Sequence, residues 1–107
     1  MPVLYLSAPN ARTQMGAFYK SFNTILANGV GPDYGINANL IGLIHAGDMV
    51  VVFDRDQQLR AEGVVATYSP KGKAGNNVQR YDVHIHSLTV VPYTNPPRVN
   101  RFGVAVI

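Results

Sequence analysis

Three basic side chains lie in one stretch of the sequence that contains no acidic residue. Lys71, Lys73 and Arg80 fall within residues 63–81, a stretch without Asp or Glu. Lys and Arg side chains bind the phosphate groups of nucleic acids, and the Gly and Asn residues around them suit a loop that follows a nucleic-acid backbone. We therefore expect Lys71, Lys73 and Arg80 to contact phosphate. A soluble hairpin loop without a partner has a similar composition and is the alternative.

Two tyrosines flank the same basic stretch. Tyr68 precedes it and Tyr81 follows it, so both are expected on the strands that border the loop. An exposed aromatic ring stacks on unpaired bases with little sequence preference. The combination of a basic loop and bordering tyrosines favours DNA or RNA as the partner.

A second group of polar residues follows the first apolar run. The segment Ser7-Ala8-Pro9-Asn10 stands where a first strand is expected to meet a helix. Exposed backbone N–H groups and a hydroxyl at such a place suit an anion or a polar planar ligand. The alternative is that Asn10 only caps the helix, which is the usual role of Asn at this position.

Two histidines could form part of a metal site. His84 and His86 are two residues apart, so on a strand both imidazoles point to one face, together with the carboxylate of Asp82. A metal site needs further ligands from elsewhere in the fold, and the remaining histidine, His45, belongs to a different expected element. The incomplete ligand set favours the alternative, an exposed polar strand face, and we expect no bound metal.

The sequence offers little that indicates an enzyme. Asp48, Asp54 and Asp56 stand in expected turns, where Asp is favoured for its local hydrogen bonds. Neither a phosphate-binding glycine loop followed by Lys nor a Ser–His–acid order is present. We expect no catalytic residues and no cofactor.

Length and composition limit the class of molecule. The chain has 107 residues, 47% of them hydrophobic and only 14% charged, with a formal net charge of +3 and no Cys. This length and apolar content suit one folded domain over residues 1–107, and the absent cysteines exclude disulfides and thiol catalysis. No stretch is long and apolar enough for a membrane span, and no targeting signal is visible, so a cytoplasmic protein is expected.

The elements that position these residues follow from periodicity. Met15, Phe18, Tyr19, Phe22, Ile25 and Leu26 are spaced like one face of a helix that ends at Asn28-Gly29. A short helix is expected within 36–44 and loops at 29–35 and 69–77. The expected strands are residues 3–6, 49–53, 59–68, 81–91 and 102–107, with a polar turn at 54–58 and an irregular stretch at 92–100.

The strand pattern contains two tertiary signals. Residues 49–68 predict a β-hairpin, and the run of apolar residues at 49–53 predicts a strand that is buried on both faces. The apolar phase of the 81–91 strand moves by one residue after Ser87, which indicates a β-bulge and a bend. The predicted fold is α+β, a small mixed β-barrel (pseudobarrel) of about five strands, capped by one main helix and a short helix.

The order of these elements resembles the PUA-like superfamily, and within it the EVE-type domains. The resemblance covers residues 3–93. It is carried by the opening strand with its polar end, Tyr5–Asn10, by the apolar segment with a Gly-Asp turn, Ile44–Phe53, and by the returning strand, Ala61–Tyr68.

This resemblance implies a pseudobarrel that binds nucleic acid and holds a modified or flipped base in an aromatic-lined pocket. Ser7, Asn10, Tyr5 and Phe53 would line that pocket, although the chain contains no Trp and Asp54 follows Phe53. The expected function is a non-enzymatic nucleic-acid-binding module. The alternative is a small-molecule or protein-interaction domain with a barrel pocket and no nucleic-acid role.

Overall fold

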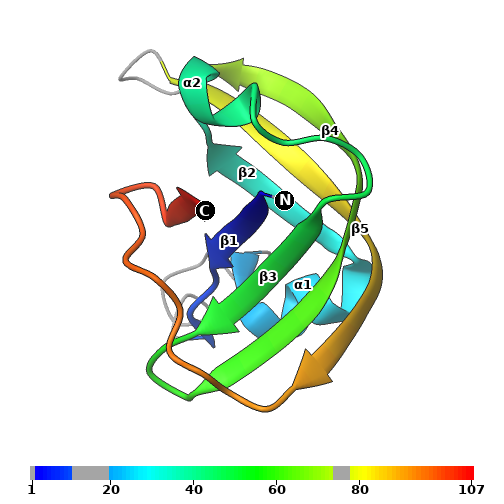
Figure 1. Cartoon of the computed structure of the whole chain (residues 1–107), viewed down its shortest axis with the longest axis vertical. Coiled ribbons are helices and arrows are strands. Elements are labelled where there is room, and N and C mark those ends of the chain that lie inside the picture. The colour runs from blue at the N-terminus through cyan, green and yellow to red at the C-terminus, as the bar shows by residue number, and fades with distance from the viewer. Residues whose placement is uncertain (1, 11–19, 74–77) are drawn as a thin grey trace.

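The computed structural model describes residues 2–10, 20–73 and 78–107, which form a half-barrel of six strands with two short helices (Figure 1). The mixed sheet has the strand order β2-β5-β4-β3-β1-β6. The strands are β1 (Val3–Ser7), β2 (Val30–Gly35), β3 (Met49–Asp54), β4 (Leu59–Lys73), β5 (Gln79–Val91) and β6 (Val104–Val106). The α+β class is confirmed, with six strands rather than about five.

The first strand lies in the middle of one half of the sheet. β1 pairs in parallel with β3, from Val3 opposite Met49 to Ser7 opposite Phe53, and in antiparallel with β6. Because side chains alternate along a strand, Leu4 and Leu6 point into the core and are fully buried. The face of the sheet that carries these residues is called the inner face below, and the opposite one the outer face.

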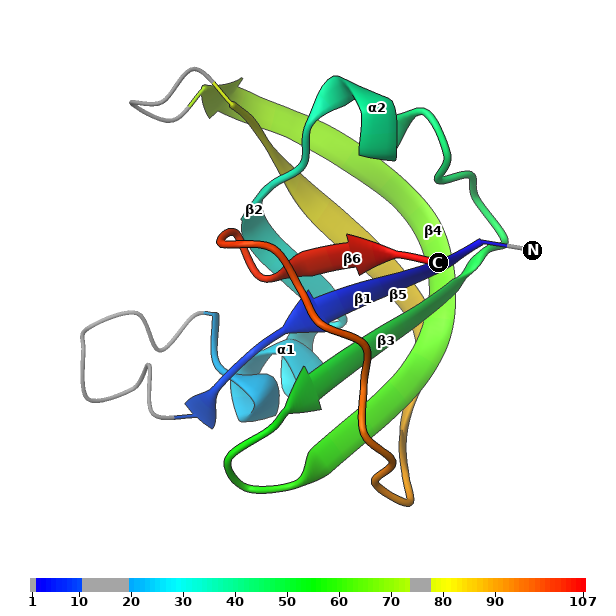
Figure 2. The same cartoon turned by 60° about the vertical axis from the view of Figure 1, so that its left-hand side comes forward.

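The predicted hairpin of residues 49–68 is confirmed. β3 and β4 pair in antiparallel, with Asp54 opposite Leu59 at the turn. Val50 and Val52 belong to the inner core cluster, while Val51 and Phe53 are equally buried on the outer face. The irregular segment 92–100, called the strap below, crosses this outer face (Figure 2). β3 is therefore buried on both faces, as its apolar run predicts.

The long hairpin of β4 and β5 bends the sheet. Its ladder shifts register three times, and Ser87 has a φ of 58° at the shift nearest the turn into the strap. The β-bulge expected after Ser87 is thus confirmed. Gly63 lies at the same shift, where a Cβ atom would come within 2.6 Å of Ile85 Cγ2 and 2.8 Å of the His86 carbonyl oxygen. β4 and β5 are therefore so close at Gly63 that a side chain at this position would clash with β5.

The prediction of a loop at residues 29–35 is wrong, because Val30–Gly35 forms β2 and pairs with β5. Pro32 is tolerated since β2 is an edge strand, where a missing N–H breaks no interior ladder. Asp33, with a φ of 59°, accommodates a register shift between Gly31 and Tyr34. Gly31 leaves room for Leu6, whose Cδ1 would lie 3.0 Å from an added Cβ.

The prediction of a loop beginning at Ser69 is also wrong. β4 continues to Lys73, which pairs with Gln79 at the start of β5. Gly72, with a φ of +100°, lies at the third register shift of the ladder. The polar residues from Ser69 to Lys73 therefore remain paired with β5. Residues 74–77 of the expected loop lie outside the described residues.

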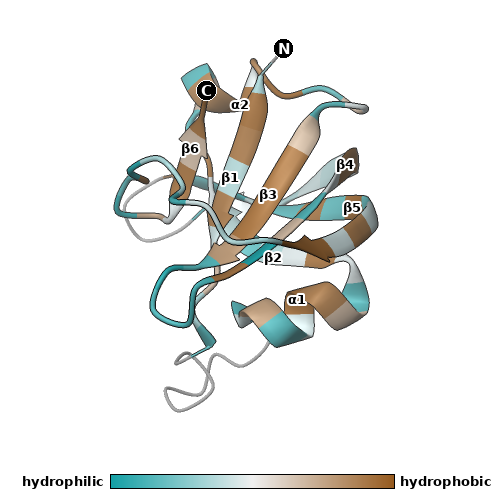
Figure 3. Cartoon of the chain, turned by 60° about the horizontal axis from the view of Figure 1, so that its bottom comes forward, coloured by the Kyte–Doolittle hydropathy of each residue, from teal (hydrophilic) through white to brown (hydrophobic). Residues whose placement is uncertain are grey.

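The main helix ends where the sequence predicts. α1 (Phe22–Asn28) ends at Gly29, which has the left-handed φ of 70° and donates its N–H to the Ile25 carbonyl oxygen. The N-cap of α1 is Ser21, and residues 11–19, where the helix expected after Asn10 would begin, lie outside the described residues. The apolar side of α1 buries Phe22 and Ile25 against the sheet below β2 and β3 (Figure 3).

A short helix and one hydrogen bond across the interior complete the half-barrel. α2 (Ala38–Ile41) is capped by Asn37, whose side chain accepts the Leu40 N–H at 3.0 Å. The Tyr34 hydroxyl donates to the Ser7 carbonyl oxygen at 2.8 Å and links β2 to β1 across the interior. None of the helices in the described residues has the length and hydropathy that a membrane crossing requires.

The close approach at Gly63 predicts that Gly63→Ala lowers the free energy of unfolding by about 1–3 kcal/mol, because the new methyl group must displace Ile85 and the β5 backbone. Urea unfolding of the full chain measures the change. Gly42→Ala is the matched control: Gly42 has an ordinary φ of −64°, and its nearest neighbour would lie 3.5 Å from the added Cβ. Equal midpoints for the two variants would contradict this account.

Candidate nucleic-acid interface

The three predicted phosphate contacts lie at the free end of the β4–β5 hairpin. Arg80 pairs with Gly72 and Lys73 pairs with Gln79, so the side chains of Lys73 and Arg80 occupy successive ladder positions and project from opposite faces of the hairpin. Lys71 and Lys73 are exposed, and Arg80 is half-buried. These residues, Lys71–Lys73 with Gln79 and Arg80, are called the hairpin tip. The acid-free stretch thus lies at one end of the hairpin, and its basic residues are divided between the two faces.

One acid that the sequence pattern did not take into account borders the hairpin tip. Lys71 Nζ lies 3.5 Å from Asp82 Oδ2, and Asp82 Oδ1 accepts the Asp33 N–H at 3.0 Å. Asp82 is one residue beyond the acid-free stretch, and the antiparallel register returns it to the neighbourhood of Lys71. Part of the charge of Lys71 is therefore neutralised within the protein.

The two tyrosines pack against each other rather than standing apart as separate stacking faces. Tyr68 and Tyr81 make an edge-to-face contact with ring centroids 5.6 Å apart and an interplanar angle of 88°. Both rings are half-buried and lie against the core. The contact fixes the Tyr81 ring beside the hairpin tip, since aromatic pairs prefer this geometry.

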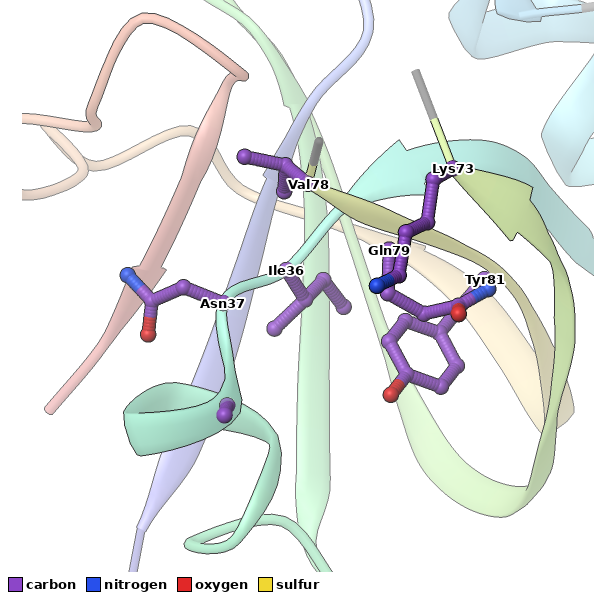
Figure 4. Close-up of a pocket in the computed structure, with 7 residues that line it drawn as sticks. Ile36, Asn37, Lys73, Val78, Gln79 and Tyr81 are labelled. Atoms are coloured by element: carbon purple, nitrogen blue, oxygen red, sulfur yellow. The ribbon is translucent and has the colours of Figure 1, made fainter. Parts of the chain in front are cut away.

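A pocket of about 240 Å³ opens next to the hairpin tip (Figure 4). In Figure 4, Lys73, Gln79 and Tyr81 lie along one side of it, Ile36 and Val78 lie nearer its centre, and the Asn37 amide points away. Apolar side chains together with a few polar groups are the usual lining of a ligand site. It is lined by Ile36, Asn37, Ala38, Lys73, Val78, Gln79 and Tyr81 and is called the hairpin-tip pocket.

Two polar groups at the hairpin-tip pocket have no partner in the part of the chain that the structure describes. Among the described residues, Lys73 forms no ion pair. Neither the Lys73 ammonium nor the Tyr81 hydroxyl takes part in a side-chain hydrogen bond there. The Gln79 amide, in contrast, donates to the Gly72 and Arg80 carbonyl oxygens at 3.0 Å. Lys73 and Tyr81 are thus available to a ligand, whereas Gln79 holds the hairpin tip in shape.

The second predicted group lies at the carboxyl end of β1, in a different place. The free end of β4 is at the top of the molecule in Figures 1 and 2, whereas the end of β1 lies below its centre in both views. Ser7 donates its N–H to the Gly103 carbonyl oxygen at 2.8 Å and pairs with Phe53. The structure does not join this group to the hairpin tip.

Tyr5 and Phe53 share the outer face with two arginines. Phe53 is 1% exposed, and the Arg55 guanidinium carbon lies 5.5 Å from its ring centroid. Arg60 lies 5.8 Å above the Tyr5 ring and pairs with Glu62 at 3.1 Å. Phe53 is buried with Arg55 against its ring, so it offers no open face to a base.

Asn10 and Asp54 bind the end of β1 to the β3–β4 turn. The buried Asp54 carboxylate accepts N–H groups from Asn10, Asp56 and Gln57 at 2.9–3.2 Å. Asn10 Oδ1 accepts the Asn23 N–H at 3.0 Å, so it satisfies a donor of the first turn of α1 without being the N-cap. Both side chains have structural partners, and these explain the acid after Phe53.

The histidine pair has the predicted orientation but forms no metal cluster. Val83 and Ile85 are buried, while Asp82, His84 and His86 alternate with them on the outer face. Among residues 2–10, 20–73 and 78–107, no three His, Cys, Asp or Glu side chains are grouped so as to hold a metal ion.

Comparison of the chain with protein-family models, with curated proteins and with solved structures found no match. The function is therefore inferred from the hairpin tip and its pocket alone.

The role of Asp54 predicts that Asp54→Ala lowers the free energy of unfolding by about 2–3 kcal/mol, because three backbone N–H groups lose their acceptor. Chemical denaturation measures the loss. Asp56→Ala removes an exposed acid from the same turn and is expected to change stability by less than about 0.5 kcal/mol. A loss at Asp56 as large as that at Asp54 would refute the assignment.

Proposed function

We propose that this protein is a non-enzymatic module that binds DNA or RNA through the hairpin tip. The observation that carries the proposal is the position of exposed Lys73 beside the partly exposed ring of Tyr81, at a hairpin end that also carries Lys71 and Arg80. Basic side chains contact phosphate and aromatic rings stack on bases, so this arrangement suits a polynucleotide better than either group alone.

Within the proposed interface, Lys73 and Arg80 contribute more than Lys71. Neither Lys73 nor Arg80 takes part in an ion pair with a described carboxylate, whereas Lys71 is within 3.5 Å of Asp82. Phosphate binding at Lys71 must compete with that carboxylate. The proposal therefore assigns the strongest single phosphate contact to Lys73, which is exposed at the end of β4.

Recognition of a modified or flipped base is a narrower form of the proposal. The side chains that favour it are Tyr81 and the apolar residues of the hairpin-tip pocket, because they lie beside the proposed phosphate contacts. Phe53 is buried, and Asn10 is held by Asn23 and Gln57. A base extracted near the hairpin tip would meet the Tyr81 ring first.

The proposal predicts that Lys73→Ala weakens binding of a short oligonucleotide at low salt more than Lys71→Ala does. Each lost phosphate contact also reduces the slope of log K against log salt concentration by about 0.7–0.9. Fluorescence anisotropy at several salt concentrations gives both quantities for the same variants. Both lysines are exposed, so the substitutions leave the core intact.

Arg101→Ala is the matched control for Lys73→Ala. It removes the same charge from another exposed residue, one that stacks on Phe102 with its guanidinium carbon 4.9 Å from the ring centroid. Binding by this variant is expected to keep the wild-type salt slope. Failure to bind DNA and RNA at low salt, with or without modified bases, would overturn the proposal, as would equal losses at Lys73 and Arg101.

The hairpin-tip pocket also favours a second candidate function, a binding domain for a small anionic molecule. Lys73 supplies a positive charge and Tyr81 a hydroxyl above the apolar side chains of Ile36 and Val78. A ligand held in this way contacts one cation, so its affinity would change little with salt. The salt slope of polynucleotide binding separates the two functions, because several phosphate contacts give a steep slope.

A further inference from the structure

A second surface depression lies between the β3–β4 turn and the strap. It is lined by Arg55, Arg98 and Val99 and has a volume of about 420 Å³. Both arginines are exposed, so their guanidinium groups border a space that is open to solvent. The nucleic-acid proposal does not use this depression, because neither arginine belongs to the hairpin tip.

Contacts on two sides hold the Arg55 side chain in place. Its guanidinium carbon lies 5.5 Å from the Phe53 ring centroid, and its Nη2 donates to the Pro97 carbonyl oxygen at 3.2 Å. Phe53 is 1% exposed and belongs to the central strand β3, so the aromatic support is rigid. Little side-chain entropy remains to be lost when such an arginine binds a ligand.

No carboxylate neutralises the two arginines in the described part of the chain. Its ion pairs join Arg60 to Glu62 and Lys71 to Asp82, and His45 Nδ1 lies 3.9 Å from Asp48 Oδ2. Asp54 is buried, and its oxygens accept three backbone N–H groups. Asp56, an exposed acid on the same turn, forms an ion pair with neither arginine. Two guanidinium groups therefore border one depression, and neither forms an ion pair with a described carboxylate.

We propose that this depression is a phosphate-binding site in which Arg55 and Arg98 hold the anion between them. A guanidinium presents its N–H donors in a planar fork that matches the oxygens of a phosphate group. The Arg55 side chain is held in place by Phe53 and Pro97, and the Arg98 side chain extends from the strap. A tetrahedral anion between the two side chains compensates the charge that the protein leaves unpaired.

The phosphate site is separate from the proposed nucleic-acid interface. The β3–β4 turn lies at the lower end of the molecule in Figure 1, and the hairpin tip lies at its upper end. The residues that form the two sites do not overlap. Substitutions at one site therefore leave the other intact, and the two proposals can fail independently.

Titration of the isotopically labelled full chain with inorganic phosphate, followed by NMR of the arginine Nε–H signals, tests the proposal. Potassium chloride at equal ionic strength serves as the reference. Saturable shifts are expected at Arg55 and Arg98 and not at Arg101, the exposed arginine outside the depression. Arg98→Ala is expected to weaken phosphate binding roughly tenfold, since it removes charge-assisted hydrogen bonds. Arg98→Lys should restore part of the affinity, and Arg101→Ala should leave it unchanged.

A second titration with a short oligonucleotide distinguishes the sources of the phosphate group. Shifts at Arg98 with both ligands support a site that accepts the phosphodiester of a polynucleotide. Shifts with inorganic phosphate alone support a site for free phosphate or a phosphomonoester. The absence of saturable shifts with either ligand overturns the proposal, and so does an affinity for phosphate that Arg98→Ala leaves unchanged. A loss of oligonucleotide binding in the Lys73→Ala variant changes neither conclusion about the phosphate site.

Discussion

The close contact between β4 and β5 at Gly63 is the constraint on which the rest of the fold depends. A Cβ atom at this position would lie 2.6 Å from Ile85 and 2.8 Å from the His86 carbonyl oxygen, so only glycine permits the register shift opposite Ser87. Bulges increase the twist of a strand pair and bend it. The bent hairpin takes part in both halves of the sheet, pairing with β2 at one edge and with β3 in its middle. Its free end carries the hairpin tip.

Interactions on the outer face divide the arginines into different roles. Arg60 is paired with Glu62 and lies over Tyr5, so its charge is used within the protein. Arg55 is oriented by Phe53 and the Pro97 carbonyl oxygen and forms no ion pair with a described carboxylate, and we propose that it binds phosphate. The strap thus covers the apolar residues of β3 and, through Arg98, borders the depression beside them. A net charge of +3 is too general to reveal this division.

The sequence predicts the elements whose signals are local and misses those that depend on pairing. Gly29 marks the end of α1 through its own backbone freedom, and the phase change after Ser87 marks the bulge through the spacing of neighbouring apolar residues, so both signals are local in the sequence. β2 was missed since Gly31 and Pro32 are usual in loops, and only its edge position allows them in a strand. Composition identifies the basic residues of the hairpin tip, but only the register shows that Lys73 and Arg80 project from opposite faces. That Asp82 pairs with Lys71 follows only from the antiparallel register of β4 and β5.

The central claim is that a polynucleotide binds at the free end of the β4–β5 hairpin. Ultraviolet crosslinking of the full chain to a short radiolabelled oligonucleotide, followed by mass spectrometry of the crosslinked peptides, tests it most directly. The account predicts crosslinks in the peptides that carry Tyr68, Lys73 and Tyr81, because the Tyr81 ring lies beside the proposed phosphate contacts. Crosslinks confined to the end of β1 or to the strap, or no crosslink at low salt, would contradict it.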